Sequence, residues 1–582
     1  MVTATESFRS AGRTLRRGFH LDLWTAGAAL IAAVVAAPLF FVLLMALSPS
    51  GGIWEHLLAT VLARYVRTTL SLMLGVGLGT LFIGTAAAWL VSLHQFPGRR
   101  LFEWALLLPM AMPAYIIAYV YTDLLEYAGP AQVFLRTLFG WTSGRDYWFP
   151  EIRSLGGAIA MMTLVLYPYV YLLARAAFAE QSLSLLEASR TLGCGPWRSF
   201  LTVALPMARP AIVVGVSLAL METLNDYGTV DFFAVQTFTL GIFDVWLNMN
   251  SVSGAAQLAL VALAFVLALI GTERWARRNQ RFYQTGSKYR AVSRQPLQGK
   301  RGLLASAACF VPILLGFLLP AGVLLRYALR YSDQIFSGNY LAYARNSLLL
   351  SAVSAVAAVA AGLFMAYGAR VGGGKAVRAA AQFASTGYAV PGAVLAIGVL
   401  IPLSRLDAAL DALWRGMTGA SAGYLLTGSI TAVVYGYLVR FLALSHGASR
   451  ASLAKITPGM EGVARTLGHG PLRTLLGVHL PLIRGSLLAA GILVFVDGMK
   501  ELPMTLILRP FNYETLATYV HQYASRGLLE ESALGALTIV ASGILPVILL
   551  SATIRSAPRS GDFGDPTRGS VPGTPPQAEA AR

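Results

Sequence analysis

The sequence predicts an all-α membrane protein with about twelve transmembrane helices, arranged as two parallel halves of six. Of its 582 residues, 56% are hydrophobic and 12% are charged, and the mean hydropathy is +0.62. A soluble domain carries about 25% charged residues. The chain also contains a series of apolar runs, each long enough to cross a hydrocarbon core of about 30 Å as a helix. A spanning barrel would show short alternating segments instead.

The apolar runs divide the chain into five segments. Residues 1–22 form a predicted cytoplasmic segment, and residues 274–302 a basic cytoplasmic linker. The first half, residues 23–273, holds predicted spans at 23–47, 69–93, 102–124, 155–177, 208–227 and 255–271. The second half, residues 303–555, holds spans at 303–325, 347–367, 379–403, 429–444, 485–508 and 534–552. Residues 556–582 are rich in Pro, Gly and polar residues, which predicts a disordered tail.

The charge pattern sets the predicted topology. Residues 274–301 contain nine Lys or Arg and no acid, so this stretch should be cytoplasmic. Six spans on either side then place both termini in the cytoplasm and give the halves the same orientation, as parallel repeats. The net charge of +18 follows from such topology signals, so membrane lipid and not nucleic acid is the expected partner.

Two polar loops between apolar runs repeat each other in detail. Residues 190–206 and 465–481 are related by a constant offset of 275 and share 11 identities in 17 positions. In each copy a glycine, Gly193 or Gly468, is placed to end a short helix in a left-handed cap. A Gly-Pro pair then starts a second helix that runs to a Leu-Pro at the membrane surface. The loops are predicted to be helix–turn–helix units lying along the membrane, with His469 and His479 as solvated residues. They could anchor the bundle or dock a partner, and the duplicated detail favours docking.

These loops resemble the EAA loop of ABC importer permeases, which couples the membrane helices to a cytoplasmic ATPase. The resemblance implies a fused permease of the type I importer fold in a bacterial inner membrane, with two copies of an ATP-binding subunit and a periplasmic binding protein. The second loop departs from the pattern, because its Glu461 precedes Arg465 by four residues and Gly462 weakens its helix by about 1 kcal/mol. It is therefore expected to couple less firmly. The coupling residues that the resemblance assigns are Glu187, Ala188, Arg190, Gly193, Gly195 and Pro206, and Glu461, Arg465, Gly468, Gly470 and Pro481.

The chain has no Gly-x-x-x-x-Gly-Lys-Ser/Thr motif with which to hold ATP phosphates. ATP and Mg²⁺ are therefore expected on the partner ATPase, and this chain is expected to bind no cofactor and to catalyse no reaction. An ion-coupled secondary transporter would also fit twelve spans in two parallel halves, but it gives no reason for twin docking loops.

A second resemblance concerns the cargo. The stretches 222–239 with 241–246, and 495–510 with 515–518, resemble the ferric-iron branch of these permeases. The thiamine and aminoethylphosphonate branches are close relatives and remain alternatives.

Acidic residues end the fifth and eleventh predicted spans. At the offset of 275, Glu222 pairs with Asp497 and Asp226 with Glu501, and Lys500 lies beside them. Ionisable residues at membrane depth usually face a pore or one another, and ferric iron, a hard cation, prefers oxygen ligands. These five residues are either a substrate pathway or a structural network in which Lys500 pairs with Glu222 or Asp226. No metal site is assigned to them.

Overall fold

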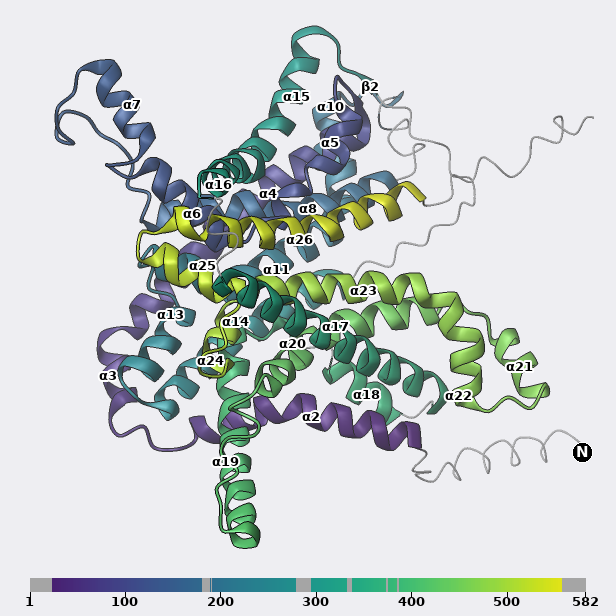
Figure 1. Cartoon of the computed structure of the whole chain (residues 1–582). Helices are drawn as coiled ribbons and strands as arrows, with labels where there is room; N and C mark the ends of the chain where they lie inside the picture. Colours follow the sequence, from purple (N-terminus) through teal and green to yellow (C-terminus); the bar gives the residue numbers. More distant parts are fainter. Residues whose placement is uncertain are drawn as a thin grey trace, which may run out of the picture.

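The computed structural model describes residues 23–180, 189, 191–278, 295–331, 338–372, 375–384 and 387–556. Within these ranges the chain is a bundle of helices with one two-stranded pairing (Figure 1). The predicted N-terminal segment, most of the basic linker and the predicted tail lie outside the described residues. So do three of the predicted coupling residues, Glu187, Ala188 and Arg190.

The first part of the chain ends with helix α14 (Val252–Arg278). Before it come α2 (Leu23–Ala46), α3 (Ile53–Thr60), α4 (Leu62–Leu93), β1 (His94–Gln95), α5 (Arg99–Ala105), η1 (Leu108–Ala111), α6 (Ala114–Leu125), α7 (Pro130–Phe139), α8 (Leu155–Glu180), α10 (Pro196–Ser199), η2 (Phe200–Ala204), α11 (Leu205–Asn225), α12 (Gly228–Phe232), α13 (Phe238–Phe243) and η3 (Asp244–Asn248).

The remainder begins with β2 (Gln295–Pro296), which pairs in parallel with β1. It continues through α15 (Gly299–Ile313), η4 (Leu314–Leu318), α16 (Leu319–Arg330), α17 (Gly338–Gly372), α18 (Lys375–Ala384), η6 (Gly387–Ala389), α19 (Gly392–Thr418), α20 (Thr431–Leu453), α21 (Pro458–Thr466), α22 (Pro471–Thr474), η7 (Leu475–His479), α23 (Leu480–Lys500), α24 (Pro503–Leu508), α25 (Leu516–Ser525) and α26 (Leu529–Ser556).

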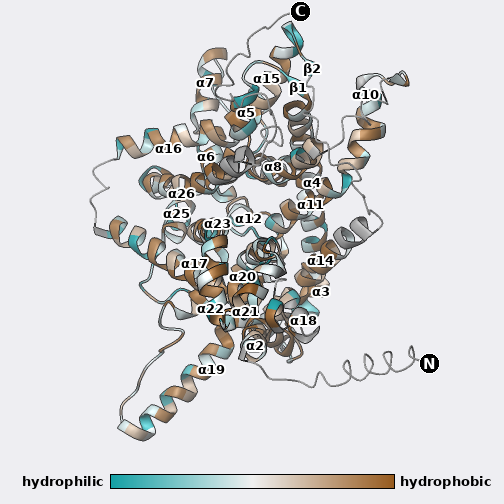
Figure 2. Cartoon of the chain, turned by 90° about the vertical axis from the view of Figure 1, so that its right-hand side faces the viewer, coloured by the Kyte–Doolittle hydropathy of each residue, from teal (hydrophilic) through white to brown (hydrophobic). Residues whose placement is uncertain are grey.

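Ten helices in the described part of the chain are long and apolar enough to cross a membrane, or eleven if one bent pair counts as a span. Hydrophobic residues predominate along these helices (Figure 2). The bent pair is the predicted span 102–124, which the structure breaks by 90° between Ala111 and Ala114. The predicted span 429–444 falls on α20, which is not among the ten. Because α20 packs against α17, α19 and α23, it is shielded from lipid and can carry polar residues such as Arg440.

Elements around the two loops recur at the offset that the sequence predicted. Helices α22, η7 and α23 begin 275 residues after α10, η2 and α11. The same offset relates the starts of α12 and α24. The start of α2, the end of α26, and helices α21 and α22 all lie at one end of the bundle, on the right of Figure 1.

The prediction that each loop's second helix stops at Leu-Pro is wrong, whereas its orientation along the membrane stays a prediction. Residues Trp197–Asn225 and Pro471–Lys500 are each one continuous helix. Before each proline, one turn widens into a π-helix, in which Leu205 N–H donates to the Phe200 carbonyl and Leu480 N–H to the Leu475 carbonyl. A proline ring clashes with the carbonyl four residues earlier in an α-helix, and a π-turn relieves that crowding. The same device precedes Pro320.

Glycines allow the helices to approach closely. Gly75 and Gly79 lie on one face of α4, where they meet Ile159 and Thr163 of α8. At the crossing of α19 and α2, a Cβ added at Gly398 would lie 2.2 Å from the Pro38 carbonyl oxygen. An added methyl group would therefore meet the backbone of α2, which cannot move aside as a flexible side chain can.

We expect Gly398→Ala to destabilise the protein by about 1–3 kcal/mol, because the added methyl group forces α19 away from α2. Gly416→Ala in the same helix is the control, because nothing lies within 4 Å of its added Cβ. There the alanine should stabilise the helix by up to about 1 kcal/mol. Thermal unfolding of the purified chain measures both changes, and equal midpoints would contradict the close crossing.

Candidate functional site

A polar cavity of about 100 Å³ lies where α11 and α23 end. The structure brings all five residues of the predicted pathway to its lining: Glu222, Asp226, Asp497, Lys500 and Glu501. Tyr115, Tyr169, Asn225, Tyr388 and Arg440 also line the cavity, together with apolar residues.

Asp226 and Glu501 hold the chain at equivalent turns. Each follows the last residue of a long helix and has an extended backbone, so the helix stops there. Asp226 accepts hydrogen bonds from the N–H groups of Thr229 at 2.9 Å and Val230 at 3.3 Å. Glu501 accepts them from the N–H groups of Met504 at 3.2 Å and Thr505 at 3.1 Å. These carboxylates satisfy the free N–H groups at the starts of α12 and α24, so they build the cavity wall.

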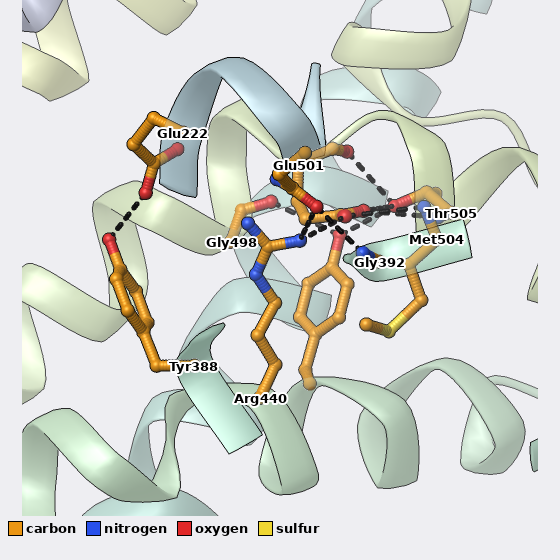
Figure 3. A network of polar contacts seen from close by, with 10 residues as sticks. Glu222, Tyr388, Gly392, Arg440, Gly498, Glu501, Met504 and Thr505 are labelled. Carbon is orange, nitrogen blue, oxygen red and sulfur yellow. Dashed lines mark hydrogen bonds and ion pairs between the residues drawn. The ribbon is translucent and has the colours of Figure 1, made fainter. Parts of the chain in front are cut away.

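Arg440 links four helices beneath this wall (Figure 3). Its Nη1 lies 3.2 Å from Glu501 Oε1 and donates to Asn225 Oδ1 over 2.9 Å. The Gly392 N–H donates to the same Asn225 oxygen over 2.6 Å. The Arg440 and Glu501 side chains are only 6% and 3% exposed. Because a buried charge must be paired, this contact holds α20 and α23 against the ends of α11 and α19.

Glu222 and Asp497 have different partners. Glu222 Oε1 accepts a hydrogen bond of 2.6 Å from the hydroxyl of Tyr388 (Figure 3). Asp497 Oδ1 lies 2.9 Å from Nζ of Lys500, one turn further along α23. The predicted pairing of Lys500 with Glu222 or Asp226 is therefore not found, because Asp497 on the same helix is closer to Lys500.

The sequence reasoning missed Arg440, Tyr388 and Asn225. Arg440 could have been found, because it is a charge inside the apolar run 429–444, and such a charge marks a functional or paired position. Tyr388 carries no comparable signal, since only the fold brings it to the cavity. Asn225 directly precedes the predicted Asp226, so its place beside the acids could be read from the sequence.

Negative groups outnumber positive ones in this cavity. Its lining carries four carboxylates against one guanidinium and one ammonium group. Among the residues that the structure describes, no three His, Cys, Asp or Glu converge as a metal site. The excess of carboxylates can attract a cation.

The two loops end their first helices alike. Gly193 and Gly468 have φ of 82° and 75°, so both adopt the predicted left-handed conformation. The next N–H reaches back five residues, from Cys194 to the Ser189 carbonyl and from His469 to the Ala464 carbonyl, both over 3.0 Å. This is the Schellman pattern, and Gly195 and Gly470 follow it in both copies.

The second loop is tied to the bundle through Glu461. Its Oε1 lies 2.5 Å from Nε of Arg370 on α17 and 3.4 Å from Nε2 of His479. Arg370 also donates to the carbonyls of Leu453 and Ile456, just before α21. The prediction that His479 is solvated is wrong, because this side chain is fully buried beneath the loop. The weaker coupling expected of this loop stays a prediction, and these contacts oppose it.

Large apolar side chains remain exposed on both loops. Leu192 is 84% and Trp197 is 74% exposed in the first loop. In the second loop the exposed side chains are Met460, Val463, Leu467 and Leu472. Clustered apolar residues on a polar loop are typical of a protein–protein contact.

Comparison with known proteins identifies the class. Residues 80–280 match the family described as the binding-protein-dependent transport system inner membrane component. The Fe(3+)-transport system permease protein FbpB 2 of Haemophilus influenzae is 26% identical over 503 residues, which are 85% of this chain and 91% of that protein. The molybdenum permease ModB of Escherichia coli is 29% identical over 34% of this chain and 86% of its own length. The sulfate permease CysT of Escherichia coli is 28% identical over 45% of this chain and 94% of its own length.

The chain is therefore a multi-pass inner-membrane permease of the binding-protein-dependent class of ABC importers. Proteins of this class work with an ATPase and a periplasmic binding protein, so ATP hydrolysis resides on the partner and this chain is not an enzyme.

We expect Arg440→Met to destabilise the protein by about 3–5 kcal/mol, because it leaves Glu501 buried without its partner. Combining it with Glu501→Gln should recover part of this loss. The control is Arg415→Met. Arg415 pairs with Asp411 but is 61% exposed, so its substitution should cost no more than about 1 kcal/mol. Chemical unfolding measures all three, and a loss for Arg440→Met as small as the control's would contradict the bridging role.

Proposed function

We propose that this permease forms the pore for ferric iron delivered by a periplasmic binding protein. The observation that carries the proposal is the excess of carboxylates around the cavity between α11 and α23. Ferric iron is a hard cation that prefers oxygen ligands. An oxyanion such as molybdate or sulfate would favour a cavity rich in Arg or N–H donors, and this lining has two fewer basic groups than carboxylates.

The relatives support the same choice. The ferric-iron permease aligns with 85% of this chain, and so with both of its parts, at 26% identity. The molybdenum and sulfate permeases align along 86% and 94% of their own, shorter lengths at 29% and 28% identity, so their oxyanions are the alternatives that the uptake test must exclude. Thiamine and a phosphonate are the alternatives that the sequence left open, and the cavity's charge balance disfavours a phosphonate.

Each cavity carboxylate already has a partner, which suits a transport pathway better than a tight ion-binding site. Asp226 and Glu501 are engaged by backbone N–H groups, Glu222 by Tyr388 and Asp497 by Lys500. A passing ion would meet negative charge but would not displace these contacts completely. Transport requires such a balance, since the ion must be attracted enough to enter and weakly enough held to leave.

The two loops are proposed to carry ATPase motion to this pathway, one ATPase copy to each loop. The proposal assigns to docking the coupling residues named from the sequence, and the exposed apolar side chains of both loops support it. Continuous helices join each loop to the cavity, from Trp197 to Asn225 and from Pro471 to Lys500. Because the backbone stays helical through the π-turn, a displacement of the loop would be passed along the helix to the carboxylates at its far end. The loops and both termini then belong to the cytoplasmic side.

The test is uptake of radiolabelled ferric iron into proteoliposomes that contain the permease, its ATPase and the binding protein. We expect ATP-dependent uptake of iron and none of molybdate, sulfate, thiamine or a phosphonate. Uptake without the ATPase, driven by a proton gradient, would overturn the assignment in favour of a secondary transporter.

Glu222→Gln and Asp497→Asn should each lower iron uptake at least about fivefold. Removing one charge at about 4 Å from the ion costs about 1–4 kcal/mol for effective dielectric constants between 80 and 20. Glu126→Gln, in a half-exposed surface pair with Arg153, is the control and should transport normally. Normal uptake by both cavity variants would show that the acids are purely structural.

Arg370→Gln should uncouple the second loop, because Glu461 and the carbonyls before α21 lose their common partner. We expect the iron transported per ATP hydrolysed to fall several-fold while ATP hydrolysis continues. The ratio for Arg370→Lys should lie between those of the unaltered protein and Arg370→Gln, since lysine keeps the charge but loses the forked geometry. Arg450→Gln, on an exposed residue of α20, serves as the control, and an unchanged ratio in Arg370→Gln would contradict the role.

A further inference from the structure

Helix α19 (Gly392–Thr418) leaves the bundle partway along its length. Its first eight residues, 392–399, are all buried. From residue 405 to residue 418 most side chains are exposed. Figure 1 shows α19 running crosswise to α2, and Figure 2 shows it extending beyond the edge of the bundle. The helix is long and apolar enough to span a membrane, yet its direction differs from that of the spans beside it.

The depth at which α19 leaves the bundle follows from its crossing with α2. Gly398 crosses α2 at Pro38, eight residues before α2 ends at Ala46. At a rise of 1.5 Å per residue, the crossing lies about 12 Å inside the end of α2. The projecting half of α19 therefore starts at membrane depth and not in the water beyond the spans.

One face of the projecting half is covered by the chain itself. Asp407 accepts hydrogen bonds from the N–H groups of Leu426 and Thr427, both over 2.8 Å. One turn further, Asp411 accepts from the Ala422 N–H over 2.8 Å and pairs with Arg415. Residues 407, 411 and 415 share a face, so the returning segment 420–427 lies along the polar side of the helix.

The remaining face is apolar and is about half or more exposed at most of its positions in the described part of the chain. Leu406, Leu410, Leu413 and Met417 recur at spacings of four and three, which places them in one stripe. The exposed fractions of Leu406, Leu413 and Met417 are 49%, 66% and 81%, and Trp414 beside them is 49% exposed. An amphipathic helix with one apolar stripe and a Trp is typical of the membrane interface.

We propose that residues 405–418 of α19 do not span the membrane but lie in its plane, embedded in the lipid leaflet at the end of the bundle opposite the two loops. The occupant of the apolar stripe is lipid. A soluble partner would have to reach a surface that begins about 12 Å inside the end of a span, whereas acyl chains already surround that level. The proposal depends on the chain being a membrane protein and not on its cargo.

We call residues 405–418 of α19 the arm. The segment of the first half that corresponds to α19 is broken into two helices, and this difference supports the proposal. Residues 114–139 form two helices, α6 and α7, where α19 is one. The break lies at 126–129, where Gly129 packs against the carbonyls of Asp123 and Leu124. Figure 1 shows α7 turned outward, beyond the ends of the spans. Only the unbroken helix stays at membrane depth.

Embedding the arm has a consequence for the cavity. The Gly392 N–H at the start of α19 donates to Asn225, and an added Cβ there would meet Arg440 at 2.8 Å and Glu501 at 2.9 Å. One end of α19 therefore touches the cavity wall while the other would be held by lipid. The leaflet thus holds this wall in place while the other helices move.

The test places a spin label at Leu413→Cys or Met417→Cys after Cys194→Ala and Cys309→Ala, in bilayers of phosphatidylethanolamine and phosphatidylglycerol. The matched control is Ala420→Cys, an exposed position in the segment that covers the polar face. We expect the ratio of oxygen to nickel-chelate accessibility to be several-fold higher at residues 413 and 417 than at residue 420. Adding the loaded binding protein should leave this ratio unchanged.

Two outcomes would overturn the proposal. Equal nickel-chelate access at residues 413 and 420 would place the arm in water. Protection of residue 413 only after the binding protein is added would make the stripe a protein-docking surface. Neither outcome depends on iron uptake, so a failure of this proposal is distinguishable from a failure of the assigned cargo.

Discussion

The buried contact of Arg440 with Glu501 and Asn225 is the constraint on which the centre of the molecule depends. A guanidinium group that is almost fully enclosed must keep its partners, because the cost of an unpaired buried charge exceeds the stability of most single contacts. Its partners stand at the ends of α11 and α23, and the Asn225 amide oxygen also binds the first N–H of α19. These contacts therefore fix the positions of four helices relative to one another around the cavity.

The carboxylates at this centre divide into two kinds. Asp226 and Glu501 occupy equivalent turns and hold the short helices α12 and α24 by their N–H groups. Glu222 and Asp497 face the cavity with single partners, a tyrosine hydroxyl and a lysine. The first kind builds the wall, and the second gives the cavity its accessible negative charge. The structural and the functional interpretation of these acids thus apply to different residues of the same group.

The long helices connect this centre to the loops without interruption. Three times along the chain a π-turn precedes a Leu-Pro pair, and twice this lies between a loop and the cavity. The wider turn accommodates a proline that would otherwise break the helix. The second loop is also tied to α17 by Arg370. Helical backbone therefore connects each loop to the cavity wall.

The sequence by itself determined the helical membrane class, most of the spans, the repeat at offset 275, the left-handed glycines and the five polar residues of the cavity, because apolar length, glycine and charge act locally. It did not determine the continuity of the helices through Leu-Pro, the break near residue 112, or the lipid-shielded position of α20. It also could not identify the partners of Glu222, Glu501 and Glu461. Only the tertiary structure decided these, because Tyr388, Arg440 and Arg370 reach the carboxylates from helices distant in the chain. The direction of α19 belongs to the same category, since its composition suits a span and only its crossing with α2 turns it aside.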